Sequence, residues 1–224
     1  MMTPHHPGGY DVPTPTPVEI FVDPMCPFAW LTSRWLGEVE RLGRIDLTIR
    51  IMSLSILNED REDASEFYRD LVDRAWGPAR LAIAIERDYC PDALRRWYDE
   101  LGRRIHTGGE QIDVDLLAET LAATALPDTL LAAAHPGTAT DPARIDELLR
   151  ESHRHAVDSV GDDVGTPVVH INDGGRTIAF FGPVVNPAPQ GAEAVRLFDG
   201  VALVAGTPGF FELKRTRTGP LVFA

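Results

Sequence analysis

The stretch FVDPMCPFAW, residues 21–30, places a cysteine and then a proline at the expected junction of a strand and a helix. The run VEIFVD, 18–23, is short and rich in β-forming residues, which is typical of a strand. Over residues 27–42 apolar side chains recur every three to four positions, and Gly43 is a natural stop signal. The sequence therefore predicts a strand, a tight turn and a helix, with Cys26 where the helix begins.

The rest of the chain divides into a helical middle and a second β region. The run IDLTIRIMSL, 45–54, alternates with period two and predicts a second strand, parallel to the first by the crossover rule. Helical periodicity bounded by Gly, Pro or Asp signals then predicts six helices. Their expected ranges are 62–76, 78–88, 91–104, 113–125, 127–134 and 142–160.

β character returns in TPVVHIN, 166–172, and TIAFFGPVV, 177–185. The Asp-Gly pair between these runs is a strong hairpin signal. A last helix is expected near 189–200, and a short terminal strand after 206–209. The order of elements is thus β-α-β, a helical block of about a hundred residues, and then β-β-α.

The position expected for Cys26 carries a chemical prediction. The unpaired N–H groups of a helix N-terminus favour a thiolate, and such cysteines have pKa values of about 3.5 to 7.5 against about 8.5 for a free thiol. Pro27 suits the first helical turn, where no N–H is needed. Cys26 could instead be a small buried apolar residue. The Cys-Pro pair at a strand-to-helix turn favours the functional interpretation, and we predict a thiolate at neutral pH.

The order of elements, with Thr166 and Pro167 directly before the third strand, resembles the α/β thioredoxin-like fold with a large helical insertion, as in the DsbA family. More narrowly, FVDPMCPFAWLTSRWL, 21–36, resembles the active-site segment of the mycothiol-dependent nitroreductase branch, whose motif is Cys-Pro-Trp-Cys. Phe28 stands in place of the motif's Trp, and Ala29 in place of its second Cys. The chain therefore carries a CPFA variant of the CPWC motif.

The resemblance also implies a division of the chain. Residues 1–16, without periodicity and rich in Pro, Gly and Thr, are expected to form a disordered tail. Residues 17–60 and 161–224 would together form the thioredoxin-like domain. Residues 61–160 would form an inserted helical subdomain that packs as a lid over Cys26.

A set of binding residues follows from the resemblance. Pro167 takes the place of the cis-proline that faces the active cysteine, although from sequence alone a trans-proline at the start of an edge strand is the ordinary interpretation. The Thr166 backbone would then be free to pair with a bound thiol. Pro27, Phe28 and Trp30 would line the same place, the two aromatic rings as a wall for a planar substrate.

Ala29 decides the expected mechanism. In a two-cysteine oxidoreductase the second thiol attacks the mixed disulfide formed by the first, and alanine cannot do this. We therefore expect a monothiol route, in which Cys26 is the nucleophile and a low-molecular-weight thiol, by resemblance mycothiol, forms and resolves the mixed disulfide. The substrate would be a small electrophile such as a nitro compound, or a mixed disulfide. Cys90 is the only internal substitute as a resolving thiol, and its simpler role is packing.

Two other functions stay open. A kappa-class glutathione transferase or the related isomerase shares the inserted fold, and there the enzyme activates the thiol of its cofactor, commonly with Ser in place of Cys26. A degenerate, non-catalytic binding protein of the same fold is the third interpretation. The retained cysteine argues against the transferase or isomerase, and the loss of the second cysteine argues for it.

Bulk properties exclude several classes of function. The net charge of -13 over 224 residues disfavours binding to nucleic acid or to anionic membrane surfaces. No apolar run approaches the roughly 20 residues that span a bilayer, and no secretory signal is seen, so a cytoplasmic enzyme is expected. Two cysteines are too few for a disulfide scaffold. The oligomeric state is not predicted.

Metal and nucleotide cofactors are not expected. His153, His155 and His170 could suggest a metal site, yet His153 and His155 are two positions apart on a predicted helix and do not face the same way. No Gly-rich dinucleotide or phosphate-loop motif is present.

Overall fold

The structure is a computed structural model, and it describes residues 14–59, 66–135, 137–138 and 141–223. The strands are β1 (Thr16–Val22), β2 (Ile45–Ile51), β3 (Val168–Asp173) and β4 (Arg176–Phe181). The α-helices are α1 (Pro27–Arg41), α2 (Leu54–Leu57), α3 (Glu66–Asp88), α4 (Pro91–Gly102), α5 (Val114–Ala123), α6 (Pro142–Val157) and α7 (Gly191–Ala205). A π-helical turn, η1 (Arg103–Thr107), and a 3-10 helix, η2 (Asp128–Ala134), complete the described elements.

The four strands form one mixed sheet in the order β2-β1-β3-β4. β1 is parallel to β2 and antiparallel to β3, and β4 is antiparallel to β3. Ile20 in β1 lies opposite Ile49 of β2 and Val169 of β3, so the two ends of the chain meet in the centre of the sheet. The predicted parallel pair and the later hairpin are both confirmed.

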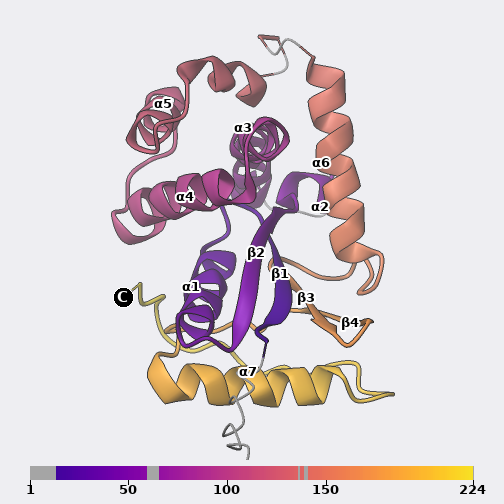
Figure 1. Ribbon diagram of the computed structural model, residues 1–224. Coiled ribbons are helices and arrows are strands. Elements are labelled where there is room, and N and C mark those ends of the chain that lie inside the picture. Colours follow the sequence, from indigo (N-terminus) through magenta and orange to yellow (C-terminus); the bar gives the residue numbers. More distant parts are fainter. Residues whose placement is uncertain (1–13, 60–65, 136, 139–140, 224) are drawn as a thin grey trace, which may run out of the picture.

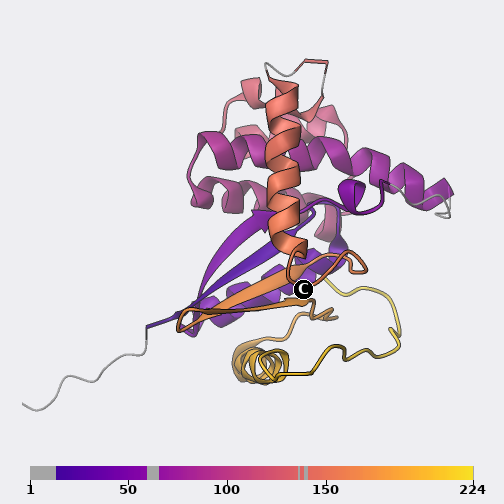
Figure 2. The ribbon, with the colours of Figure 1, turned by 90° about the vertical axis from the view of Figure 1, so that its right-hand side faces the viewer.

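Helices cover both faces of the sheet. On one face Val18, Ile20 and Val22 point into the main core with α1 and α7, and the indole Nε1 of Trp35 donates to the Ala194 carbonyl at 2.9 Å. On the other face Phe21 packs against the end of α6. The remaining helices lie beyond the end of the sheet where β1 and β2 end (Figure 1), and α6 returns from them to the sheet (Figure 2).

This arrangement is an α/β fold with a helical insertion, as predicted, and it differs from the expected boundaries in one informative place. We expected a break between helices 62–76 and 78–88, but α3 continues through Pro78. A proline inside a helix costs about 3 kcal/mol. Ala79, Leu81 and Ala82 next to it are fully buried, and this apolar burial offsets the cost. The expected start at residue 62 lies outside the described residues.

Other expectations about the elements also differ from the structure. The strand expected to reach residue 54 ends at Ile51, because the hydroxyl of Ser53 accepts the amide of Ile56 and caps the short helix α2. Segment 127–134 is a 3-10 helix rather than an α-helix. No terminal strand follows 206–209 in the part of the chain described up to residue 223. Of the expected tail, residues 1–13 lie outside the described residues, and β1 already begins at Thr16.

Candidate active site

Cys26 is the N-cap residue of α1, as the sequence predicted. Its Sγ accepts a hydrogen bond from the Ala29 amide at 3.4 Å and donates one to the Thr166 carbonyl at 3.5 Å. Pro27 occupies the first turn, where its missing N–H leaves no bond unmade. The fold therefore joins the cysteine to a residue 140 positions away, at the meeting point of α1 and the start of β3.

The Thr166–Pro167 peptide bond is cis, as the resemblance implied for Pro167. The Thr166 backbone is less free than expected, because its carbonyl already accepts the Cys26 thiol. The hydroxyl Oγ1 of Thr166 is buried and has no hydrogen-bond partner among the described residues. A buried polar atom without a partner is costly, so this position suits a ligand with a polar group next to its reacting atom.

The charge state of Cys26 differs from the prediction. The sulfur is buried, with 7% of the residue exposed. Burial raises the pKa of the Cys26 thiol, and the nearby charge of Asp23 adds to this, whereas the Ala29 amide, which donates a hydrogen bond to the sulfur, acts in the opposite direction. The prediction of a thiolate at neutral pH is wrong for this closed site, because desolvation outweighs the helix N-terminus.

Asp23 shapes the loop that carries the cysteine. Its carboxylate is fully buried and accepts the amides of Met25 at 2.8 Å and Leu54 at 2.7 Å, and its own carbonyl accepts the Cys26 amide at 3.0 Å. Burial raises the pKa of Asp23 to about 6, and the two amide hydrogen bonds act in the opposite direction. The side chain thus fixes the turn before α1 and places a carboxyl group near the thiol.

The two aromatic residues of the motif have different surroundings. Trp30 is buried under α4, with its ring 5.6 Å from that of Tyr98 and with the guanidinium of Arg34 4.1 Å above it. A Cβ on Gly102 would lie 2.3 Å from the indole, so only glycine allows this approach of α4. Phe28 is only partly buried. Of the expected aromatic wall, Phe28 is thus the member that a ligand can reach beside Cys26.

The helical insertion reaches the cysteine loop through His106 of η1. The Nε2 atom of His106 lies 3.0 Å from the Pro24 carbonyl, and its ring lies 6.1 Å from that of Trp30. His106 was not predicted as a site residue, since an isolated histidine belongs to no recognisable motif. The insertion thus contacts the loop that carries Cys26, and whether it covers the cysteine as a lid stays a prediction.

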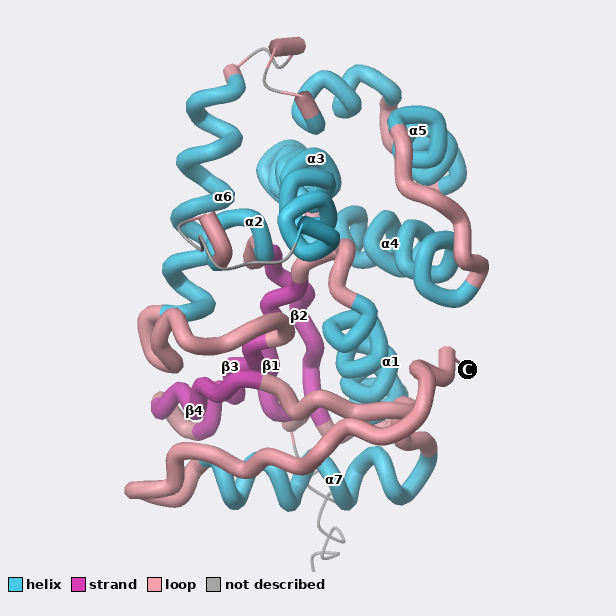
Figure 3. Tube along the Cα trace, turned by 180° about the vertical axis from the view of Figure 1, so that it is seen from behind, coloured by secondary structure: helices cyan, strands magenta, loops and turns pink. Residues whose placement is uncertain are grey.

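Residues 217–223, here called the C-terminal strap, form a second cover that sequence analysis missed. The Arg217 guanidinium lies 4.6 Å above the ring of Phe28, and the ring of Phe223 stacks on His106 with centroids 6.2 Å apart. Asn186 holds the strap by donating to the Pro220 carbonyl and by accepting the Val222 amide. Figure 3 shows this segment running past α7 to the side of α1. No sequence pattern points to the strap, because it has no regular secondary structure.

The buried His106 should make the protein less stable in acid. Burial lowers the pKa of His106 to about 4, so it binds a proton more weakly in the folded than in the unfolded chain. Its contribution is present above pH 6.5 and is lost as pH falls toward 4, by at most about 3 kcal/mol. His106→Gln should therefore lose less free energy of unfolding than wild type between pH 6.5 and 4. Urea denaturation measures this difference, and His135→Gln, at an exposed histidine, is the matched control.

Cys90 does not have the packing role that we expected. It is exposed at the start of α4, and its side chain makes no capping hydrogen bond there. Both Cys26 and Cys90 are free thiols. Whether Cys90 resolves a disulfide on Cys26 stays a prediction for experiment.

The reactivity of the two thiols should follow their exposure. Iodoacetamide at pH 7.5 should label Cys90 first, because Cys26 is buried with a raised pKa. The labelling rate of Cys26 should still be rising above pH 8.5, and unfolding in guanidinium should make the two rates similar. Peptide mass spectrometry against time measures both rates. Faster labelling of Cys26 than of Cys90 at pH 6 would restore the thiolate interpretation.

The histidines weighed as metal ligands are partly brought together. His153 is buried, and its Nδ1 accepts the Ser53 amide at 3.3 Å, so it has a structural role. His155 and His170 do meet, with ring centroids 5.4 Å apart. The helical spacing correctly separated His153 from His155 but could not show that β3 places His170 beside the latter.

A helix-capping cysteine opposite a cis-proline, in this sheet with a helical insertion, defines a DsbA-like thioredoxin-fold oxidoreductase. Solved structures share the fold. The cytosolic disulfide reductase DsbM from Pseudomonas aeruginosa has a TM-score of 0.53 at 15% identity, over 84% of this chain and 98% of that one. The probable DsbA oxidoreductase SCO1869 from Streptomyces coelicolor has a TM-score of 0.51 at 14% identity, over 92% and 94%.

Sequence comparison identifies the family within this class. The model of the Rv2466c-like family, described as mycothiol-dependent nitroreductase Rv2466c, matches residues 25–215. The chain is also 30% identical over 204 residues to the uncharacterized protein Rv2286c of Mycobacterium tuberculosis, covering 91% of this chain and 83% of that protein. The chain belongs to the Rv2466c-like family of thiol-dependent oxidoreductases. Among the described residues, no helix is long and apolar enough to cross a membrane.

Proposed function

We propose that this protein is a cytoplasmic oxidoreductase in which Cys26 acts as a single nucleophilic thiol, with mycothiol as co-substrate. Its substrate would be a small electrophile, a nitro compound, or a mixed disulfide. The observation that carries the proposal is the position of Cys26, which caps α1 opposite Thr166 while alanine occupies position 29. One thiol is thus held where the family motif has two.

The absence of a second thiol at position 29 sets the order of steps. Ala29 is fully buried, and its amide contacts the Cys26 sulfur, so a thiol on its side chain would have been next to the first. With alanine there, a disulfide on Cys26 has no partner within its own motif. A free thiol from solution must therefore resolve it.

The chemistry balances with two molecules of the co-substrate. In the first half, the Cys26 thiol and one mycothiol give up two electrons and two protons and form a mixed disulfide, while a nitro group becomes a nitroso group and releases water. In the second half, a second mycothiol attacks the mixed disulfide, restores the Cys26 thiol and leaves as oxidised mycothiol.

The residues around the sulfur suit a polar thiol. Once the sulfur of Cys26 is in a disulfide it no longer donates, so the Thr166 carbonyl becomes free to accept an N–H from the bound thiol. The unpartnered Thr166 hydroxyl lies on the same residue and gives a second polar contact. Phe28 provides the apolar side of the site. Pro27 and Pro167 restrict the backbone conformation of the site, and the buried ring of Trp30 packs in the core behind it.

A second candidate is favoured by one observation. Because burial raises the pKa of Cys26, the enzyme could instead activate the thiol of its cofactor and leave Cys26 unreacted, as in kappa-class glutathione transferases and the related isomerases. A degenerate binding protein would also leave it unreacted. Neither alternative forms a disulfide between Cys26 and the thiol co-substrate. Detection of such an adduct therefore distinguishes the proposal from both.

The whole-chain features support the same proposal. The charge of -13 fits a small-molecule enzyme better than a nucleic-acid-binding or membrane-binding protein. We propose that residues 17–60 and 161–224 carry the thiol chemistry and that the insertion, 61–160, covers it. The contact between His106 and Pro24 is the observation that supports this division.

The test is a turnover assay with purified mycothiol and a nitroaromatic compound. The proposal expects two mycothiols consumed for each nitro group that becomes a nitroso group, and no turnover when free mycothiol is omitted. Substrate loss is followed by absorbance and thiol loss by a colorimetric reagent. Thiol consumption with formation of a thioether product instead of oxidised mycothiol would support the transferase alternative.

A further inference from the structure

A second cluster of reactive side chains lies on the face of the sheet opposite α1. It consists of Glu19 from β1, His155 from α6 and His170 from β3. One potential ligand atom of each side chain lies within 4.8 Å of the others. Three separate elements, of which β1 is far in sequence from the other two, therefore bring two imidazoles and a carboxylate to one point.

The ring of His170 is oriented by a backbone carbonyl, as is usual for a histidine that binds a metal ion. It is buried, with 2% exposed, and its Nε2 lies 3.4 Å from the Ala156 carbonyl. A histidine that donates one ring N–H to a backbone carbonyl keeps a lone pair on the other nitrogen, and this second contact orients the ring of most metal-bound histidines. Phe21 packs against both imidazoles, 4.7 Å from His170 and 5.4 Å from His155, and helps to hold the buried ring of His170 in place.

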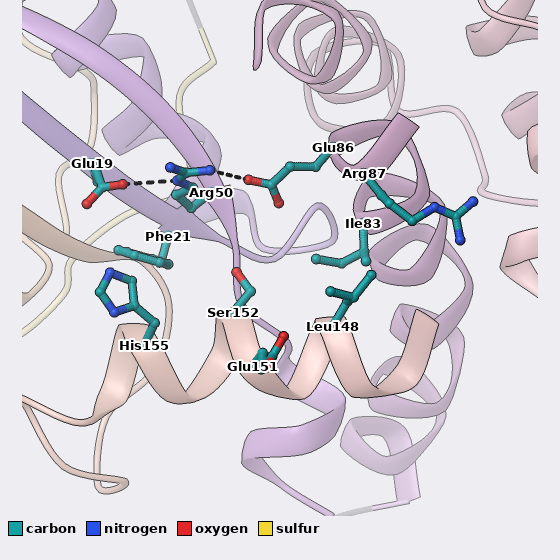
Figure 4. Close-up of a pocket in the computed structure, with 10 residues that line it drawn as sticks. All are labelled: Glu19, Phe21, Arg50, Ile83, Glu86, Arg87, Leu148, Glu151, Ser152 and His155. Carbon is teal, nitrogen blue, oxygen red and sulfur yellow. Dashed lines mark hydrogen bonds and ion pairs between the residues drawn. The ribbon is translucent and has the colours of Figure 1, made fainter. Parts of the chain in front are cut away.

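A cavity of about 380 Å³ adjoins the cluster. Glu19 and His155 stand with Phe21 at one end of it, as Figure 4 shows. The guanidinium of Arg50 bridges the carboxylates of Glu19 and Glu86, at 3.0 and 2.6 Å. A carboxylate has about four lone-pair positions, so Glu19 can hold Arg50 and still offer an oxygen to a cation.

We propose that Glu19, His155 and His170 form a site for a divalent transition-metal cation, of which Zn²⁺ is the representative, with an open coordination position facing the cavity. Two histidines and one glutamate are a donor set that binds Zn²⁺ and leaves the fourth position to water or a ligand. The set also suits Co²⁺ and Ni²⁺ and disfavours Mg²⁺ and Ca²⁺, which prefer oxygen ligands.

Small side-chain movements suffice to close the site. Ligand atoms about 2.1 Å from a tetrahedral ion are about 3.4 Å apart, so the most distant pair needs to approach by at most roughly 1.4 Å. His170 is fixed in the core, whereas His155 is exposed and Glu19 is half-buried. Rotation of the latter two side chains brings the donors together without moving the sheet.

The surrounding charges do not oppose a cation. The cavity is lined by the carboxylates of Glu19, Glu86 and Glu151 and by the guanidinium groups of Arg50 and Arg87. Arg50 is neutralised by its two glutamate partners, and Arg87 is paired with an aspartate next to it in sequence. The cavity therefore has more negative than positive groups, which favours a bound cation.

The experiment is equilibrium dialysis of the full-length chain against Zn²⁺ at pH 7.5, with Co²⁺ as a spectroscopic probe. Every protein carries Cys26→Ser and Cys90→Ser, so that neither thiol can bind metal. We expect one equivalent of Zn²⁺ and a visible Co²⁺ absorption band. His155→Ala and His170→Ala should each weaken binding at least 100-fold, and Glu19→Gln at least tenfold.

The matched control is His135→Ala, which removes an exposed histidine outside the cluster and should leave binding unchanged. His155 is exposed, so His155→Ala should fold, which circular dichroism verifies. Equal Zn²⁺ binding by the parent and by folded His155→Ala would overturn the proposal, as would less than one equivalent on the parent. Either result would leave the cluster with a packing role only.

Discussion

Cys26→Ser should abolish covalent capture of oxidised mycothiol and lower turnover of a nitro substrate by at least about 1,000-fold. The serine hydroxyl has nearly the size of the thiol and can still accept the Ala29 amide, so the start of α1 should remain intact. A hydroxyl, however, forms no disulfide, and without an adjacent base it is a weak nucleophile. Intact-mass spectrometry measures the adduct, and thiol-dependent loss of nitro absorbance measures turnover.

The control for this substitution is Cys90→Ala. Cys90 is exposed and makes no capping bond, so its removal should change neither the adduct nor the dependence on free thiol. If Cys26→Ser kept turnover within a few-fold of wild type, Cys26 would not be the nucleophile, and the transferase-like alternative would take its place.

Ala29→Cys should convert the monothiol protein into a dithiol oxidoreductase. The new thiol would lie one helical turn from Cys26, at a residue whose amide already contacts the sulfur. It should attack the mixed disulfide on Cys26, release the bound thiol and leave an internal disulfide. Exchange with a reporter disulfide, such as reduction of insulin in the presence of dithiothreitol, should rise from background to a measurable rate.

Ala29→Ser is the matched control, because it adds an atom of similar size without a thiol. Position 29 is fully buried, so either substitution could cost about 1–3 kcal/mol through overpacking. If Ala29→Cys and Ala29→Ser lose the same free energy of unfolding, any disulfide exchange seen only in Ala29→Cys comes from the new thiol and not from overpacking. A stable adduct on Cys26 that survives in Ala29→Cys would show that the helix start does not bring the two thiols into reach.

Much of the fold could be predicted from local sequence patterns. The period-two runs and the Asp-Gly pair fixed the strands of the sheet and its hairpin, and the cysteine-proline pair located the start of α1. Pro78 was misread as a break because the local rule could not include the burial that surrounds it. Tertiary packing decides such boundaries.

The site was less accessible to sequence reasoning. Cys26 and Pro167 were found through motif and resemblance, but the raised pKa of Cys26 depends on burial by distant segments. His106 and the C-terminal strap come from the insertion and from the end of the chain, and neither has a pattern that points to the cysteine. Long-range contacts of irregular segments are the part that the sequence did not reveal.

In the proposed mechanism Cys26 works without an internal resolving thiol. The most direct test is the intact mass of the wild-type protein after incubation with oxidised mycothiol and removal of free thiol. We expect one mycothiol adduct per chain, mapped to Cys26, which persists for hours and is released only when reduced mycothiol is added. Spontaneous loss of the adduct, with an internal disulfide between Cys26 and Cys90, would contradict it.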